Sequence, residues 1–161
     1  MEKMKKLKLG IIGISEGNGH PFSWSAIFNG YNSVAMEGCG FPVIPRYLEK
    51  QTWPLDQIAS ASVTHVWTQQ LSISQLISRA CYIDKIVTKP TDMIGEIDGL
   101  LLARDDAENH LKLVKPFLSA GIPVYIDKPI ALNLSDLDTL YSLQQYPGQI
   151  FSCSALKYSE N

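Results

Sequence analysis

The sequence predicts an α/β fold of the Rossmann-like kind, a doubly wound, mainly parallel six-stranded sheet with helices on both faces. Short apolar segments alternate along the chain with segments in which apolar residues recur every three or four positions. The first apolar segment runs directly into a glycine-rich turn, Ile12–His20 (IGISEGNGH). The length of 161 residues fits one domain with a single substantial core.

The strands are predicted from short apolar or β-branched runs bounded by turn residues. Leu7–Ile14 is apolar and carries glycine near its end, which is typical of a buried parallel strand. Pro21 suits the first turn of the following helix, because its missing N–H costs nothing there. The other predicted strands are 62–68, 85–88, 99–103, 123–126 and 150–154.

The helices are predicted from periodicity and from their end signals. Ile73–Ala80 repeats apolar residues at three and four positions. Asp105–Glu108 has the form of a capping box for a helix that stops near Gly121, and Asn133 with Asp136 has the same form for a helix over 133–145. Residues 33–60 are interrupted by prolines and glycines, so we expect a structured loop with one helical turn near Tyr47–Gln51.

Composition excludes several functional classes. Hydrophobic residues make up 45% and charged residues 19%, which is globular composition, and a net charge of −2 without a basic block disfavours nucleic acid and membrane surfaces as partners. Three widely separated cysteines without CxxC spacing predict reduced thiols in a cytoplasmic protein. The three histidines lack ligand-like spacing, so no metal site is predicted and metal-dependent hydrolysis is poorly supported.

Ligands in such a sheet gather beyond the carboxyl ends of the strands, so residues there are the functional candidates. Lys128 lies at a strand end between Asp127 and Pro129. Its ammonium group suits a hydrogen bond to a substrate hydroxyl or a proton relay, and the alternative is a surface lysine paired with Asp127. His110 lies in the first turns of a helix, where a packed or solvated histidine is the simpler interpretation, and Asp105 with its neighbour is interpreted as a helix cap.

The glycine-rich turn suits a dinucleotide by position and is atypical by composition. Its backbone freedom comes from three glycines, Gly13, Gly17 and Gly19. The helix that starts at Pro21 directs its positive end at the turn. Ser15 and Asn18 stand where further glycines are expected, and Glu16 would repel a pyrophosphate unless it points away.

Three stretches, GIIG, AGIPVYIDKPIAL and FSCSALKYS, resemble the N-terminal domain of the glucose–fructose oxidoreductase/inositol dehydrogenase (Gfo/Idh/MocA) family. The resemblance spans nearly the whole chain, is most specific over Ala120–Leu132, and includes the interval between His110 and Lys128. It implies an NAD(P)-dependent oxidoreductase that transfers hydride to or from a sugar, cyclitol or nucleotide-sugar-like substrate.

The resemblance also implies roles for single residues. Lys128 matches the family's active-site lysine, which contacts the reacting hydroxyl near the nicotinamide. Asp127 replaces the glutamate of the family motif, and without an acid after the second strand the choice between NAD and NADP stays open. The positions implied at the cofactor are Gly13, Ser15, Glu16, Gly17, Asn18, Thr68, Gln69, Arg104, His110, Asp127 and Pro129.

The resemblance implies that residues 1–161 form the cofactor domain and lack the family's second domain, which supplies substrate contacts and oligomerisation. Two explanations stay open, a natural stand-alone domain or a cut after the sixth strand, and the end near Lys157–Ser159 favours a cut in a longer protein. We expect the isolated domain to be inactive and the full-length protein to be a homo-oligomer. A different interpretation stays open, that of a degenerate Rossmann-like domain that has lost dinucleotide binding and acts as a scaffold or regulatory partner.

The aromatic and proline content of residues 33–60 allows two interpretations. One is a flap packed near the mouth of the cofactor site, which contact of Pro45 or Arg46 with the strand ends would support. The other is a hydrophobic cluster beside the first helix.

Overall fold

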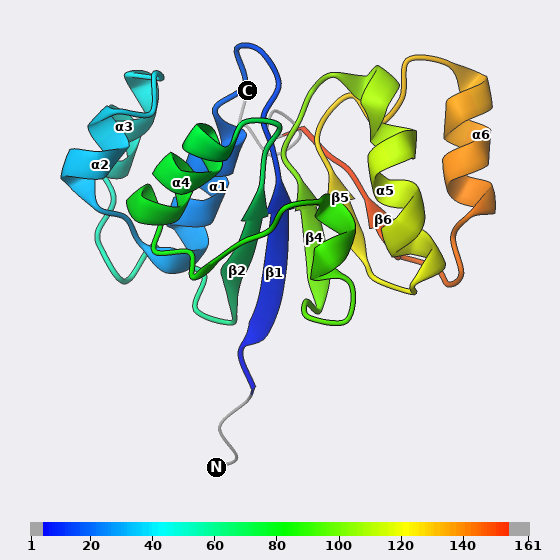
Figure 1. Ribbon diagram of the computed structural model, residues 1–161, viewed down its shortest axis with the longest axis horizontal. Coiled ribbons are helices and arrows are strands. Elements are labelled where there is room, and N and C mark those ends of the chain that lie inside the picture. Colours follow the sequence, from blue (N-terminus) through cyan, green and yellow to red (C-terminus); the bar gives the residue numbers. More distant parts are fainter. Residues whose placement is uncertain (1–4, 155–161) are drawn as a thin grey trace, which may run out of the picture.

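The computed structural model describes residues 5–154 and contains one six-stranded sheet with every pairing parallel (Figure 1). The strand order is β3-β2-β1-β4-β5-β6. The strands are β1 Leu7–Ile12, β2 Ala61–Trp67, β3 Lys85–Ile86, β4 Gly99–Leu102, β5 Val124–Ile126 and β6 Ile150–Phe151. The order reverses at β1 and β4, which is the position where folds of this type bind their ligands.

The helices form a layer on each side of the sheet, as Figure 1 shows. The elements of one layer follow β1 and β2 in the sequence, and those of the other follow β3, β4 and β5. The first consists of α1 His20–Asn29, α2 Ser33–Glu37, α3 Val43–Leu48 and α4 Leu71–Ala80. The second consists of α5 His110–Ser119 and α6 Leu134–Ser142, with the short 3₁₀ helices η1 Pro90–Met93 and η2 Ala107–Asn109.

Two hydrophobic cores result, one on each face of the sheet. Ile11 and Ile12 are both fully buried, and because consecutive strand residues point to opposite faces they enter different cores. Phe22 of α1 anchors the first core, and Phe117 of α5 anchors the second. Burial of each such side chain contributes about 1.5–3 kcal/mol, which fixes both helix layers against the strands.

The predicted fold class and the six strands at their predicted places are confirmed, although β3 and β6 are shorter than expected. The cap of α6 is also confirmed, since Asn133 accepts a hydrogen bond from the N–H of Asp136 (2.8 Å). The prediction for residues 33–60 was wrong, because this segment holds two short helices. Asn32 caps α2 by accepting from Ala35 N–H, and Pro42 directly precedes α3.

The capping box predicted at Asp105 was also wrong. The chain enters α5 through η2, and no side chain caps either helix. The Asp105 carboxylate instead accepts from the hydroxyl of Ser15, and Asp106 pairs with Arg104. Both acids are therefore used for contacts at the carboxyl end of the sheet.

Candidate functional site

The glycine loop, Gly13–Gly19, connects β1 to α1 at the carboxyl edge of the sheet. Its first residue extends the pairing of β1 with β2, because Gly13 N–H donates to the carbonyl of Trp67 (3.0 Å). A Cβ atom on Gly13 would lie 2.3 Å from Cγ of Pro21, so a side chain has no room there. Gly17 has a φ of +76°, a left-handed conformation that favours glycine. The glycines thus let the backbone turn within contact distance of α1.

The first half of the loop is held by side chains from the ends of β2 and β4. The amide of Gln69 accepts from Ile14 N–H (3.1 Å) and donates to the Ile14 carbonyl (2.8 Å). The hydroxyl of Ser15 donates to Asp105 Oδ1 (2.5 Å) and accepts from Asp105 N–H (3.1 Å). Each contact joins loop residues to another strand end, so the loop conformation is set before any ligand binds.

The second half of the loop is held by Asp127 at the end of β5. The amide of Asn18 donates to Asp127 Oδ2 (2.8 Å), and Nδ1 of His20 lies 2.5 Å from the same oxygen. The N–H of Lys128 donates to Oδ1 (2.8 Å). Asp127 is only 1% exposed, and burial alone would raise its pKa, but the hydrogen bonds from His20 and Asn18 lower it on balance. The buried group is therefore a charged carboxylate.

Two cavities lie on opposite sides of the glycine loop. The large cavity, about 500 Å³, extends toward the end of β2 and is lined mainly by apolar side chains, among them Phe22, Phe41, Ile73 and Leu76, together with Gln69 and Gln70. The small cavity, about 230 Å³, extends toward the end of β5. Its lining combines the polar side chains of Asn18, His20, Ser23, Asp105 and Lys128 with the apolar side chains of Phe41, Val43 and Ile44. Gly17 and Phe41 line both.

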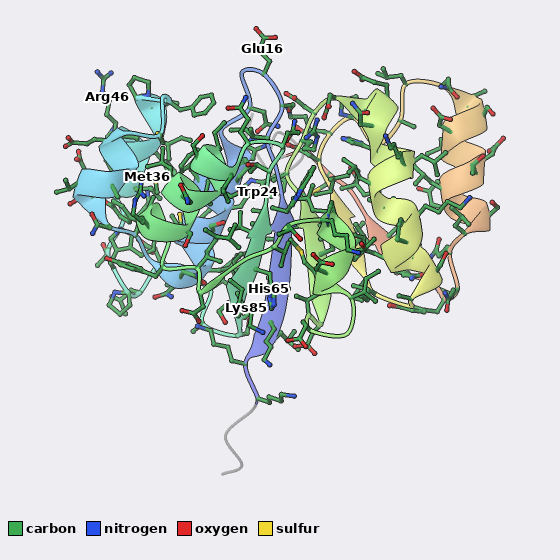
Figure 2. The ribbon with its side chains drawn as sticks, in the orientation of Figure 1. Glu16, Trp24, Met36, Arg46, His65 and Lys85 are labelled. Carbon is green, nitrogen blue, oxygen red and sulfur yellow. The ribbon has the colours of Figure 1, made fainter. Side chains whose placement is uncertain are left out.

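The tip of the loop has the character of an anion site. Within residues 5–154, the N–H groups of Ser15, Glu16 and Gly17 donate to no protein acceptor. The amino end of α1 follows at His20, whose N–H donates to Asn18 Oδ1 (2.8 Å). Figure 2 shows Glu16 at the tip of the loop with its side chain pointing away from the rest of the molecule. Backbone amides and the positive end of a helix favour a phosphate, and Glu16 does not cover them.

Lys128 lies on the same side as the glycine loop. It lines the small cavity together with Gly17 and His20, and Nζ is 4.0 Å from Asp105 Oδ2. Its side chain is about half exposed, at 49%. Pro129 comes next in the chain. Lys128 and the glycine loop thus lie together, as predicted. The catalytic role of Lys128 stays a prediction.

Three other predicted cofactor residues are engaged inside the protein and line neither cavity. Arg104 is 6% exposed and donates from Nε to Asp106 Oδ1 (2.7 Å). His110 is fully buried, with Nε2 2.8 Å from the Arg104 carbonyl and Nδ1 3.2 Å from the Ile130 carbonyl. The Thr68 hydroxyl donates to the Gln70 carbonyl (2.7 Å). These contacts stabilise the strand ends, and a cofactor contact for these residues stays a prediction.

The structure adds residues that were not among the predicted catalytic and cofactor contacts. His20 joins the Asp127 network, and Gln70 and Phe41 line the large cavity. The only sequence signal for His20 was its place directly after the glycine loop. Phe41 places residues 33–60 at the cavity wall, as a flap would be. Neither Pro45 nor Arg46 lines either cavity, and Arg46 points outward in Figure 2, so the contact expected of a flap stays a prediction.

The hydrophobic cluster expected as the alternative to a flap is present as well, in other residues of the same segment. Met36, Ile44 and Leu48 are buried in the first core with α1. Trp53 packs edge-on against Tyr31, with ring centroids 5.5 Å apart. Residues 33–60 therefore contribute both to the cavity wall and to the core.

A parallel sheet in this strand order, with a glycine turn between β1 and α1, defines a dinucleotide-binding Rossmann domain. The chain matches the Gfo/Idh/MocA family model, described as an oxidoreductase family with an NAD-binding Rossmann fold, over residues 7–154. The chain belongs to this family. The predicted family and cofactor class are thereby confirmed.

Solved structures share the fold at low identity. Myo-inositol 2-dehydrogenase from Lactobacillus plantarum is 15% identical, with a TM-score of 0.65 over 97% of this chain and 38% of that one. Scyllo-inositol dehydrogenase from Lactobacillus casei, crystallised with NAD(H) and scyllo-inositol, is 16% identical, with a TM-score of 0.59 over 86% and 33%. An oxidoreductase from Agrobacterium radiobacter, in complex with NAD+, L-tartaric acid and magnesium, is 13% identical, with a TM-score of 0.66 over 96% and 36%.

The chain spans about a third of the length of these structures. No curated protein matched it. No helix within the described residues has the length and apolar character needed to span a membrane.

Proposed function

We propose that this chain is the cofactor domain of an NAD(P)-dependent oxidoreductase that acts on a sugar, cyclitol or nucleotide-sugar-like substrate by hydride transfer. The observation that carries the proposal is the pair of cavities on either side of the glycine loop, one apolar and one containing Lys128. Family membership and the inositol dehydrogenases among the similar folds support it.

The cofactor's adenosine would occupy the large cavity, between the glycine loop and the end of β2. Ile73 and Leu76 offer apolar surface to an adenine ring, and Gln70 lies at the position where an amide can reach the ribose. The pyrophosphate would lie on the N–H groups of Ser15–Gly17 and the amino end of α1. The acid in the lining, Glu16, belongs to the glycine loop, and the residues at the end of β2, Gln69 and Gln70, are uncharged. The lining therefore favours neither NAD nor NADP.

The small cavity would hold the reacting end of the substrate. A bound nicotinamide supplies hydride transfer, and the protein supplies position and charge. Lys128 would donate a hydrogen bond to the substrate oxygen, with its ammonium group oriented by Asp105. Asp127 keeps the turn before Lys128 joined to the glycine loop, so the cofactor end and the lysine have a fixed spacing.

The proposal also covers the second domain, the assembly, the location and the partners of the full-length protein. The chain would act together with a second domain that completes the substrate site, in a cytoplasmic homo-oligomer that binds neither nucleic acid nor membrane. Its length relative to the similar structures and its net charge of −2 support these parts of the proposal.

Titration of the 161-residue chain with NADH and NADPH, followed by calorimetry, tests the proposal. We expect micromolar binding of at least one of them, with competition by ADP, because the adenosine and pyrophosphate sites lie in this domain. Absent or millimolar binding of both would contradict the proposal and favour the degenerate domain that acts as a scaffold. The replacement of loop glycines by Ser15 and Asn18 is the observation behind that alternative.

A further inference from the structure

The ring of His20 is held in one orientation by two contacts of different kinds. It stacks on Trp24, with ring centroids 4.8 Å apart and planes 13° apart. Its Nδ1 lies 2.5 Å from Asp127 Oδ2. Trp24 in turn packs edge-on against Tyr125 of β5, at 5.1 Å between centroids. The stack fixes the plane of the ring, and the carboxylate fixes its rotation.

Asp127 also determines which ring nitrogen of His20 carries the proton. Its carboxylate is buried and already accepts from Asn18 and from Lys128 N–H. A carboxylate only accepts hydrogen bonds, so neutral His20 must keep its proton on Nδ1. Nε2 is then left as an acceptor.

The Nε2 side of the His20 imidazole is the side available to the small cavity. His20 lines this cavity with Lys128, and its side chain is 35% exposed. Nε2 has no protein partner anywhere in residues 5–154. His110, by contrast, has both ring nitrogens next to backbone carbonyls and is fully buried. His20 is the histidine that can exchange a proton with a ligand.

The other polar groups of the small cavity are less suited to accept a proton. An ammonium group such as that of Lys128 has three donors and no acceptor. Asp105 already accepts from Ser15 and lies next to Lys128, and a carboxylate is a much weaker base than an imidazole near neutral pH. The small cavity therefore contains Lys128, a cation that can bind a hydroxyl, and His20, a base whose Nε2 has no hydrogen-bond partner within residues 5–154.

We propose that His20 is a catalytic acid–base residue of this site, oriented by Asp127. The assignment rests on the proposed function. In the oxidative direction the substrate O–H bond breaks as the N–H bond forms at Nε2, and the imidazolium is balanced by the Asp127 carboxylate. A bound oxidised nicotinamide would accept the hydride from the C–H bond of the same carbon, and Lys128 would hydrogen-bond the carbonyl that results. In the reductive direction Nε2 returns the proton.

The ring tautomer provides a test that needs no turnover. In the ¹⁵N-labelled chain, neutral His20 should show the Nδ1–H tautomer, and Asp127→Asn should abolish that preference. The signals of His65 and His110, which do not contact Asp127, should keep their positions and thereby show that the variant is folded. An Nε2–H tautomer for His20 in the native chain would overturn the assignment.

Kinetics of the active protein provide the second test. His20→Asn keeps an N–H group near the Nδ1 position for Asp127 but removes the acceptor. We expect kcat for polyol oxidation with NAD+ to fall about 10²–10⁴-fold, while the Kd for NADH changes less than about twofold, because His20 faces the reacting end. A kcat within a few-fold of the native value would overturn the role. Failure of the native protein to bind NADH would instead overturn the proposed function, and this assignment with it.

Discussion

The two cavities differ in the kind of side chain that lines them, although one short loop separates them. The large cavity is walled by residues of α1, α4 and the 38–41 segment, and most of them are apolar. The small cavity is walled on one side by apolar residues of the 41–44 segment and on the other by polar and charged groups that follow β1, β4 and β5, among them Lys128. The difference indicates a division of labour, with shape and apolar contact on one side and hydrogen bonding and proton exchange on the other.

The same division appears in the way the loop is held. Toward the large cavity, Gln69 fixes only the backbone of Ile14. Toward the small cavity, Asp127 gathers donors from Asn18, His20 and Lys128. Charged hydrogen bonds are roughly twice as strong as neutral ones, so the small cavity has the more rigid polar framework. Variants that act on one side only can therefore test the comparison.

Lys128→Ala removes the cation of the small cavity and should produce the largest effect. We expect turnover to fall by about 10²–10⁴-fold, because the substrate oxygen loses its donor, while ADP and NADH affinities change little. Steady-state kinetics and calorimetry measure the two quantities. Lys115→Ala, an exposed lysine of α5, is the matched control. Near-native turnover in Lys128→Ala would remove the lysine from the mechanism.

Asp127→Asn removes the charge that joins the glycine loop to β5. We expect the free energy of unfolding at pH 7 to fall by about 1.5–3 kcal/mol, the range for hydrogen bonds to a charged group. The pKa of Asp127 is lowered in the folded protein, so its contribution is fully present above the unfolded value of about 4 and is lost as the pH falls through the folded value.

Urea unfolding between pH 7 and pH 3 measures this contribution. The native chain should lose stability below about pH 4 more steeply than Asp127→Asn. Asp138→Asn, at an exposed position of α6, should follow the native curve. Parallel curves for the native chain and Asp127→Asn would mean that the carboxylate does not hold the loop.

Gly13→Ala tests whether the loop must approach α1 closely to separate the two cavities. The new Cβ would lie 2.3 Å from Pro21 Cγ, so the loop or the start of α1 has to move. We expect a loss of about 1–3 kcal/mol in the free energy of unfolding and weaker binding of both ADP and NADH. Gly38→Ala is the control for stability, since its Cβ would lie no closer than 3.4 Å to a neighbour. Equal stability of the two variants would contradict the tight approach.

The fold was predictable because its signals are local. The strands were predicted from apolar or β-branched runs, and α4 shows its buried face in the spacing of its apolar residues. The helices α2 and α3 were missed because prolines and glycines interrupt the segment. Helices this short depend on packing, and Met36 and Leu48 are buried against residues far away in the sequence.

The site was only partly predictable because its contacts are long-range. The position rule for parallel sheets places Lys128 and the glycine loop at the same edge. It does not say which side chains meet there. Asn18 and Asp127 are 109 positions apart, and Ser15 and Asp105 are 90 apart. A local pattern therefore made Asp105 a helix cap and left His20 unselected, although both belong to the small cavity.

Of the two cavities, Ile73→Ala alters only the large one, and it should have the smallest effect on ligand binding and turnover. Loss of apolar contact with the adenosine should weaken ADP and NADH binding by about 1 kcal/mol, roughly fivefold, with turnover at saturating cofactor unchanged. Val34→Ala, at a valine that is 80% exposed on α2, is the matched control. Calorimetry with ADP distinguishes this variant from Lys128→Ala, which should leave ADP binding intact. Equal ADP affinities for Ile73→Ala and the native chain would mean that adenosine does not occupy the large cavity, and the division of labour between the two sides of the loop would have to be abandoned.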